Sequence, residues 1–600
     1  MRYPTVAALV LVAAACTPLA HAQPVSAPVS NMAYEVRADA ASLAHRTLGV
    51  TTTFDVVDNA VVLLSLPAWT PGAYEISNFA RWVANFSVTE GGAPVRWDKL
   101  DYDTWRVRPT RGGKVTVTFD YIADTLDNAM AWARPDFALF NGTNLFLYPE
   151  GRSLDFPATV TVRTEPAWLV VSSMPGGGAA HSYHESNYHD LVDMPFFVGS
   201  FDLDSSSISG RTVRLATYPR GSMTGEAREQ AWQHLKRIIP VESAVFNVTP
   251  WTSYSLLQIM DSTAQGYSGL EHASSHVDIV APQFIGSEDE PSLYAHEIFH
   301  SWNVKRLRPA DMFPYRYDRA QPTPWLWLSE GVTDYYADLA EVRGGIVDAS
   351  GFYALTAAKM AEIAATVPFA LQDASLNTWV HPKDGTEYSY YPKGSLAGFM
   401  LDIIVRDASD DKRSLDTVMR ELYESTYARG HGFTHDEFWG AMSRAAGGRS
   451  FDEFEQKYVD GREPLPWAAT LSLAGLKQIP DSAARIGVTT ANDPSGAIRV
   501  LEIEPGSAAA AAGVQVGDEL VSIGDIPVAD QSFGARFRMR FEGKPSGTPY
   551  PITVKRGTQS ITLHGTLHYS ASAPRLAEDP AASPKAIRVR NGILHGTVER

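Results

Sequence analysis

Residues 294–309 read YAHEIFHSWNVKRLRP, and this stretch constrains the fold more than any other in the chain. His296 and His300 are four positions apart, which on a helix places both imidazoles on one face, about one turn apart. Both rings can then reach one ion, and Glu297 points close to it as a general base for water. The alternative is an ordinary surface helix, because HExxH supplies only two of the three protein ligands that a catalytic zinc needs.

A candidate third ligand lies downstream, in the stretch WLWLSEGVTDYYADLAEV (325–342). Glu330 follows an apolar run on a second expected helix, and Asp334 lies one helical turn further on. This spacing lets Glu330 bind the ion while Asp334 accepts a hydrogen bond from a ligating histidine. Two solvated helix acids are the alternative, but the WLSEG context and the upstream HExxH favour one Zn²⁺ per chain, held by His296, His300 and Glu330.

The chain of 600 residues is too long for one hydrophobic core, so we expect several domains. Residues 23–208 contain many short alternating runs such as VTVTFDYI and predict a β-rich, sandwich-like domain. Residues 209–467 have mainly helical periodicity with a small sheet, and the proline-containing run REPLPW ends them. Residues 468–575 form a further domain, and the Ala-, Pro- and Ser-rich tail at 576–600 is expected to be partly loose. The fold class is therefore multidomain α+β.

The N-terminus resembles a secretory signal peptide, residues 1–22. Arg2 precedes a short apolar run, and Ala-His-Ala at 20–22 is a small-x-small cleavage site. We therefore expect a periplasmic or secreted protein; a lipid anchor on Cys16 is the alternative. No other stretch is long and apolar enough to predict a transmembrane segment. The net charge of −17 argues against nucleic acid as a partner.

The arrangement of HExxH and a distant glutamate in an EGxxxYY-like helix resembles the gluzincin metallopeptidases. Four stretches are similar to one branch, the glycyl aminopeptidase family with a PDZ domain: LPAWTPGAYEISNF (66–79), YSGLEHASS (267–275), HEIFHSWNVKRLRP (296–309) and YYPKGSLAGFMLD (390–402). The resemblance spans about residues 33–575. It implies a thermolysin-like catalytic domain between the β-rich domain and a C-terminal PDZ domain. It also implies a zinc aminopeptidase for peptides with a free N-terminus, with a preference for small residues, glycine or alanine.

The resemblance implies roles for two more residues. YSGLEH is similar to the exopeptidase motif GxMEN, in which the glutamate binds the substrate's α-amino group, so Glu271 is the matching residue. Leu270 and His272 depart from that motif, and a structural role at a strand end is the alternative for Glu271. YYPKG is similar to the YxKG motif, whose tyrosine stabilises the oxyanion, so Tyr391 is the matching residue. A plain core tyrosine is the alternative there.

The segment EPGSAAAAAGVQVGDELVSIGDIPV resembles the core of a bacterial PDZ domain, with a strand, an alanine helix, a Gly turn and another strand. Arg485, Ile486, Gly487 and Val488 resemble its carboxylate-binding loop. Such a domain binds peptide ends by adding a strand to a sheet edge, so a peptide or protein ligand is expected; a module that only packs is the alternative. Two other functions stay open: a zinc endopeptidase in which Glu271 is structural, and a PDZ adaptor with an inert peptidase site. The sequence leaves the oligomeric state open.

Overall fold

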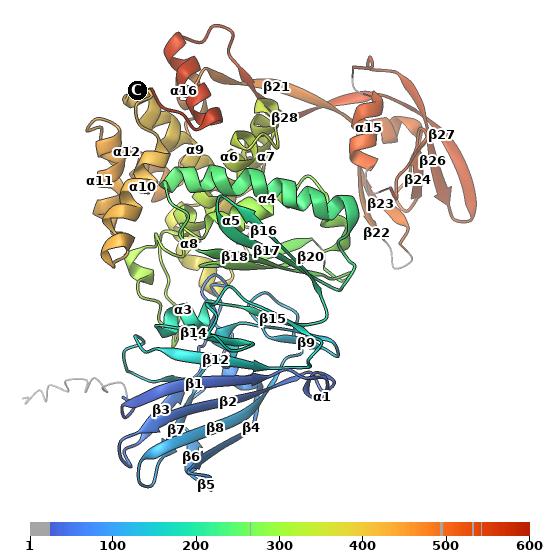
Figure 1. Cartoon of the computed structure of the whole chain (residues 1–600). Helices are drawn as coiled ribbons and strands as arrows, with labels where there is room; N and C mark the ends of the chain where they lie inside the picture. Colours follow the sequence, from blue (N-terminus) through green and yellow to red (C-terminus); the bar gives the residue numbers. More distant parts are fainter. Residues whose placement is uncertain (1–24, 265, 493–495, 531–532, 542, 600) are drawn as a thin grey trace, which may run out of the picture. The chain divides into compact units, whose positions relative to one another are not determined.

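The computed structural model in Figure 1 describes residues 25–599, except 265, 493–495, 531–532 and 542. The expected signal peptide and Cys16 lie outside the described residues. Over the described ranges, none of the helices combines the length and the apolar character needed to cross a membrane. The described residues fold into two compact units: unit 1 comprises residues 25–224, Trp251–Ile285 and Tyr315–Gln321, and unit 2 comprises Gly225–Pro250, Gly286–Pro314 and residues 322–599.

The N-terminal part of unit 1 is built from β-sheets, which confirms the β-rich domain predicted for it. One sheet has the strand order β14-β12-β1-β2-β8-β4-β5, and two smaller sheets have the orders β13-β15-β10-β9 and β11-β3-β7-β6. The strands are β1 (Val29–Arg37), β2 (Thr47–Val56), β3 (Val62–Ser65), β4 (Val83–Glu90), β5 (Ala93–Pro94), β6 (Arg96–Lys99), β7 (Thr104–Arg108), β8 (Gly113–Ile122), β9 (Trp132–Arg134), β10 (Phe137–Phe140), β11 (Tyr148–Pro149), β12 (Ala158–Arg163), β13 (Leu169–Val171), β14 (Ser182–Glu185) and β15 (Phe196–Gly199). The short helices are η1 (Phe79–Trp82), α1 (Ala40–Leu43), α2 (Gly142–Leu145) and α3 (Tyr188–Val192).

Buried and less buried residues alternate along strands such as β2 and β8, as expected for sheets that pack against a core on one face. Every second residue of β2 is buried, as expected for a strand with one face on a core. Phe86 of β4 stacks on Trp105 of β7, with ring centroids 4.8 Å apart and nearly parallel planes. Aromatic side chains therefore join the seven-stranded sheet to the sheet of β3, β7 and β6.

A five-stranded sheet completes unit 1, with the order β16-β17-β18-β20-β19. Its strands are β16 (Asp202–Ile208), β17 (Arg211–Tyr218), β18 (Ser253–Met260), β19 (Tyr267–His272) and β20 (Ser275–Val280), followed by the short η2 (Pro282–Phe284). The sequence assigned this small sheet to the helical domain. It clusters instead with the N-terminal strands, because Leu257, Ile259 and Val277 share a buried core with Phe137 and Phe197.

Unit 2 holds the helices that the sequence predicted for the catalytic domain. They are α4 (Gly225–Phe246), α5 (Glu290–Phe299), α6 (Val332–Arg343), α7 (Ala349–Ala365), α8 (Leu371–Asn377), α9 (Tyr390–Ala408), α10 (Leu415–Ser425), α11 (His435–Ala445), α12 (Asp452–Phe454) and α13 (Trp467–Leu473). Single turns, η3 (Ala310–Met312), η4 (Trp327–Gly331), η5 (Thr378–Val380), η6 (Tyr427–Arg429) and η7 (Glu455–Val459), connect or extend them. Helix α4 covers the segment EAREQAWQHLKRIIPVESAVF, whose residues have the expected helical period.

The PDZ domain in unit 2 is inserted between two paired strands, β21 (Leu476–Arg485) and β28 (His568–Glu578). Figure 1 shows these two strands side by side. The domain itself consists of β22 (Val488–Asn492), β23 (Ile498–Ile503), α14 (Ala508–Ala512), β24 (Glu519–Ile523), β25 (Ile526–Pro527), α15 (Phe533–Phe541), β26 (Pro549–Arg556) and β27 (Gln559–Thr566). The strand, alanine helix, glycine turn and second strand expected at 498–528 are all present, and Gly513 ends α14 with a φ of +85°.

The segment after Arg575, expected to be partly loose, is ordered. Strand β28 continues to Glu578, and α16 (Pro584–His595) follows, capped by the side chain of Ser583. Val589, Ile593 and Leu594 lie on one buried face of this helix. The composition of this segment did not indicate an amphipathic helix. Its cap, its N-terminal proline and its apolar spacing are nevertheless all visible in the sequence.

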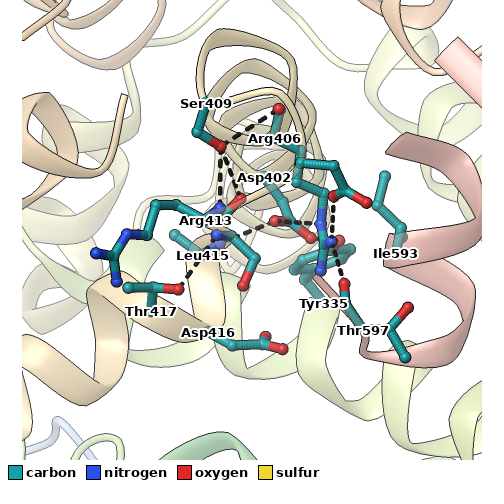
Figure 2. A network of polar contacts seen from close by, with 12 residues as sticks. Tyr335, Asp402, Arg406, Ser409, Arg413, Leu415, Asp416, Thr417, Ile593 and Thr597 are labelled. Atoms are coloured by element: carbon teal, nitrogen blue, oxygen red, sulfur yellow. Dashed lines mark hydrogen bonds and ion pairs between the residues drawn. The ribbon is translucent and has the colours of Figure 1, made fainter. Parts of the chain in front are cut away.

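Two buried arginines of the helical domain hold this C-terminal segment. Arg406 of α9 donates to the carbonyl of Thr597 at 2.8 Å and pairs with Asp402 (Figure 2). It also pairs with Asp411. Arg343 of α6 donates to the carbonyl of Ile593 at 3.0 Å. The chain therefore leaves the helical domain after α13, forms the PDZ domain and returns to pack against α6 and α9.

Candidate active site

Helix α5 and its C-terminal cap carry the HExxH residues. His296 lies in the last turn of the helix, and His300 is its cap residue, with helical backbone angles. Their Nε2 atoms are 3.0 Å apart. The spacing that the sequence predicted on a helix therefore brings the two imidazoles together.

Both histidines direct Nε2 toward the space between them. Nδ1 of His300 lies 2.7 Å from the carbonyl oxygen of Asn303, which can only accept, so Nδ1 carries the proton. Nδ1 of His296 lies 3.6 Å from Oδ1 of Asp334, which orients that ring in the same way. In these orientations both Nε2 atoms face the same space, where imidazole nitrogens could bind one cation.

Asn303 also joins the two segments that carry the ligand candidates. Its side-chain amide donates to the carbonyl of Leu328 at 2.9 Å and to the hydroxyl of Thr333 at 3.0 Å. The residue is fully buried. Sequence reasoning assigned Asn303 no role, although it lies within the HSWN part of the motif.

Glu330 comes from η4, a single π-helical turn that leads into α6. One of its carboxylate oxygens, Oε2, lies 3.4 Å from Nε2 of His296 and 3.2 Å from Nε2 of His300. Backbones approach closely behind it: a β-carbon at Gly394 would lie 2.5 Å from the carbonyl oxygen of Trp327, and one at Gly331 would lie 2.5 Å from that of Tyr390. Glycine at both positions therefore lets η4 pack directly against the start of α9.

Of the three neighbouring tyrosines, Tyr391 is the one beside the histidines. Its ring centroid lies 5.8 Å from that of His296. Tyr390 is buried, and its hydroxyl pairs with Thr378 at 3.1 Å. Tyr388 is half-exposed. The structure thus shows which of these three tyrosines lies beside the histidines. The sequence could make that choice only from the resemblance to the YxKG motif.

The three atoms His296 Nε2, His300 Nε2 and Glu330 Oε2 form a triangle with sides of 3.0, 3.2 and 3.4 Å. A tetrahedral Zn²⁺ with bonds of about 2.0–2.1 Å separates its ligand atoms by about 3.3 Å. The donor set, two imidazoles and one carboxylate, is also one that catalytic zinc uses. The residues present therefore fit one zinc ion. Glu297, which is 5% exposed, lies on the same helix between the histidines and is outside this triangle.

A buried charge network surrounds the three donors. Burial acts to raise the pKa of Glu330, but the imidazoles of His300 and His296 hold it well below its usual range. Burial likewise acts to raise the pKa of Asp334, while Lys359 and His296 hold it low. Nζ of Lys359 lies 2.9 Å from Asp334 and 2.7 Å from Asp338. Lys359 therefore fixes the carboxylate that faces His296, a role that the sequence did not indicate.

Glu271 lies in unit 1, next to the last residue of β19, and is 4% exposed. His272, which departs from the exopeptidase motif, has a partner of its own: its Nδ1 lies 3.2 Å from Oδ1 of Asp193. The substitution relative to the motif therefore has a structural use in this chain.

The loop predicted for carboxylate binding lines a groove in the PDZ domain. A cavity of about 940 Å³ is bordered by Arg485, Ile486, Gly487 and Val488. Leu520, Phe533 and Phe537 supply apolar walls. Strand β22, which also borders the groove, is the terminal strand in the order of its sheet and pairs with β23.

Comparison with protein families finds three matches. The model of the peptidase M61 N-terminal domain matches residues 34–200, the M61 glycyl aminopeptidase model matches residues 290–397, and a PDZ domain model matches residues 499–535. The second range contains the HExxH residues, Glu330 and Tyr391, whereas Glu271 lies outside it. No curated protein matches the chain.

Solved structures also align with the chain. A crystal structure of an aminopeptidase N family protein from Idiomarina loihiensis aligns with a TM-score of 0.73 and 23% identity, covering 94% of this chain and 100% of that one. The M1 zinc metallopeptidase from Deinococcus radiodurans aligns with a TM-score of 0.47 and 16% identity, covering 73% and 95%. Yeast LTA4 hydrolase in complex with bestatin aligns with a TM-score of 0.46 and 14% identity, covering 74% and 71%.

The HExxH residues and Glu330 lie within the range that the M61 glycyl aminopeptidase model matches, which supports a peptidase domain here. The chain carries the N-terminal and peptidase domains of the M61 glycyl aminopeptidase family, together with a PDZ domain. This supports an aminopeptidase and confirms the family resemblance of the sequence motifs.

Proposed function

We propose that the protein is a zinc-dependent aminopeptidase that removes small N-terminal residues, glycine or alanine, from peptides. The observation that carries the proposal is the triangle of His296 Nε2, His300 Nε2 and Glu330 Oε2, with sides of 3.0–3.4 Å. A zinc ion bound there would supply Lewis-acid activation of water and of the scissile carbonyl. The preference for glycine and alanine rests on the family match.

The chain's own residues then perform the proton transfers and the binding. Glu297 accepts a proton from the attacking water and passes it to the leaving amine. The hydroxyl of Tyr391 donates a hydrogen bond to the developing oxyanion. The carboxylate of Glu271 binds the substrate's α-ammonium, which has a pKa of about 8 and is largely charged at neutral pH.

The test is hydrolysis of glycine and alanine p-nitroanilides beside the same compounds N-acetylated, with and without a zinc chelator. We expect release only from the free amines, loss of release with chelator, and recovery on adding zinc. Glu271→Gln is expected to raise KM for the free amines, because the ammonium loses its charged partner.

Two results would contradict the proposal. Efficient cleavage of an N-acetylated internal peptide would indicate an endopeptidase in which Glu271 is structural. Well-folded protein that holds no zinc and releases nothing would indicate an adaptor built around its PDZ domain.

For the PDZ domain, we propose that the groove beside Arg485–Val488 captures peptide C-termini. The apolar walls and the terminal strand β22 support addition of an extended peptide. Fluorescent peptides with an aliphatic last residue test this: binding should require a free carboxylate, and equal binding of C-terminally amidated peptides would contradict it.

We also propose export to the periplasm or the medium, on the basis of the signal-like residues 1–22. N-terminal sequencing of the mature protein should begin at Gln23. Retention of the full N-terminus, or a lipid on Cys16, would contradict this cleavage.

A further inference from the structure

The stretch WTPGAY of the N-terminal domain forms a tight turn held on both sides. The N–H of Ala73 donates to the carbonyl of Thr70 at 3.0 Å, with Pro71 and Gly72 between them. Proline followed by a residue with positive φ, here +111° at Gly72, is typical of a type II turn. The hydroxyl of Thr70 contacts that of Thr143 at 2.6 Å, which ties the turn to the β-rich domain.

This turn packs directly on the side chain of Glu271. A β-carbon at Gly72 would lie 2.5 Å from Oε2 and 2.7 Å from Oε1 of Glu271, and 2.7 Å from Cδ1 of Leu270. Such separations are shorter than real side chains adopt, so only glycine leaves the carboxylate in its present place. The collision would involve both carboxylate oxygens of Glu271 and not the methylene groups of its side chain.

A second element of the β-rich domain holds the residues that directly follow Glu271. The carboxylate of Asp193 accepts from the N–H of Ala273 at 2.7 Å and faces Nδ1 of His272 at 3.2 Å. His272 is fully buried. Glu271 is therefore fixed between the turn at Gly72 and the residues that Asp193 anchors.

We propose that Gly72 is a positioning residue for substrate recognition: its turn sets the place of the Glu271 carboxylate that receives the α-ammonium. The inference rests on the proposed role of Glu271 as the amino-group anchor. In this proposal, a residue of the N-terminal β-rich domain takes part in substrate recognition, so the domain has more than a supporting role. A displacement of the carboxylate by about 1 Å costs on the order of 10²-fold when geometry controls the reaction.

The experiment compares Gly72→Ala with Gly113→Ala. Gly113 has nearly the same φ, +109°, but has nothing within 4 Å of an added β-carbon, so it reproduces the backbone strain without the collision. The readout is inhibition by glycine hydroxamate and by N-acetylglycine hydroxamate, which share the metal-binding group and differ in the free amine. We expect Gly72→Ala to reduce the preference for the free amine by about 10- to 100-fold, and Gly113→Ala to leave it unchanged.

A double variant makes the test specific to the contact. Glu271→Asp shortens the side chain and withdraws the carboxylate from position 72, so Gly72→Ala should cost much less in that background. If Gly72→Ala fails to fold, Asp193→Asn provides the second variant, with a smaller loss of amine preference expected.

The outcomes separate the two hypotheses. An unchanged preference in Gly72→Ala, with a preference that collapses in Glu271→Gln, overturns the inference and leaves the aminopeptidase intact. An unchanged preference in Glu271→Gln overturns the amino-group anchor itself, and the role of Gly72 with it. Equal losses in Gly72→Ala and Gly113→Ala also overturn the inference, because backbone strain alone would then explain them.

Discussion

Glu297→Gln is expected to lower kcat for glycine p-nitroanilide by about 10³-fold, within the range of about 10²–10⁴ that a general base contributes. Glutamine has the same shape but cannot accept the proton of the attacking water. Because Glu297 lies outside the triangle of His296, His300 and Glu330, the variant should bind as much zinc as the wild type. Steady-state kinetics and elemental analysis of the purified protein measure the two quantities.

The matched control is Glu288→Gln, an exposed position just before the same helix. It makes the same chemical change and should leave kcat within about twofold, as surface substitutions usually do. If Glu297→Gln retains more than a tenth of the wild-type kcat, another group is the base. If it loses zinc as well as activity, Glu297 has a role in binding the metal.

Deletion of residues 580–600 is expected to destabilise the helical domain by on the order of 5 kcal/mol or more, enough to unfold many domains. Helix α16 buries Val589, Ile593 and Leu594, and each such side chain contributes about 1.5–3 kcal/mol. Arg406, which is fully buried, would lose the carbonyl of Thr597 as an acceptor. Thermal unfolding followed by circular dichroism measures the effect.

Two controls separate this effect from a general loss of chain. Lys585→Ala, also in α16, removes a partly exposed ion pair with Asp407 of α9 and should cost only about 0–1 kcal/mol. Excision of residues 486–567, with Arg485 and His568 joined by an Asn-Gly turn, should leave the helical domain folded, because these two residues already face each other across the strand pair. A midpoint within about 2 °C of wild type after deletion of 580–600 would contradict the prediction.

Local patterns predicted the elements whose geometry depends on nearby residues. The HExxH spacing places two imidazoles on one face of α5, and the apolar spacing of residues 226–246 corresponds to α4. The alanine helix and glycine turn of the PDZ domain are also short-range features. Helix α16 has equally local signals. It was not predicted because the expectation for this segment rested on its content of Ala, Pro and Ser and not on the spacing of its apolar residues.

The contacts that complete the site are long-range, and no local pattern contains them. Asn303 bridges to Leu328 and Thr333, and Lys359 reaches Asp334 from another helix. Each of these contacts depends on which side chains the packed helices bring within hydrogen-bond distance.

The sequence by itself determined the family and the chemistry of the donors, because the HExxH spacing and the WLSEG stretch around Glu330 are each local patterns of the chain. Only the tertiary structure decided which tyrosine lies beside His296 and where the small sheet belongs. It also decided that the Gly72 turn rests on the Glu271 carboxylate, across almost 200 residues of sequence. Such contacts form when buried apolar faces of distant segments pack together, and packing of that kind leaves no periodic trace in either segment.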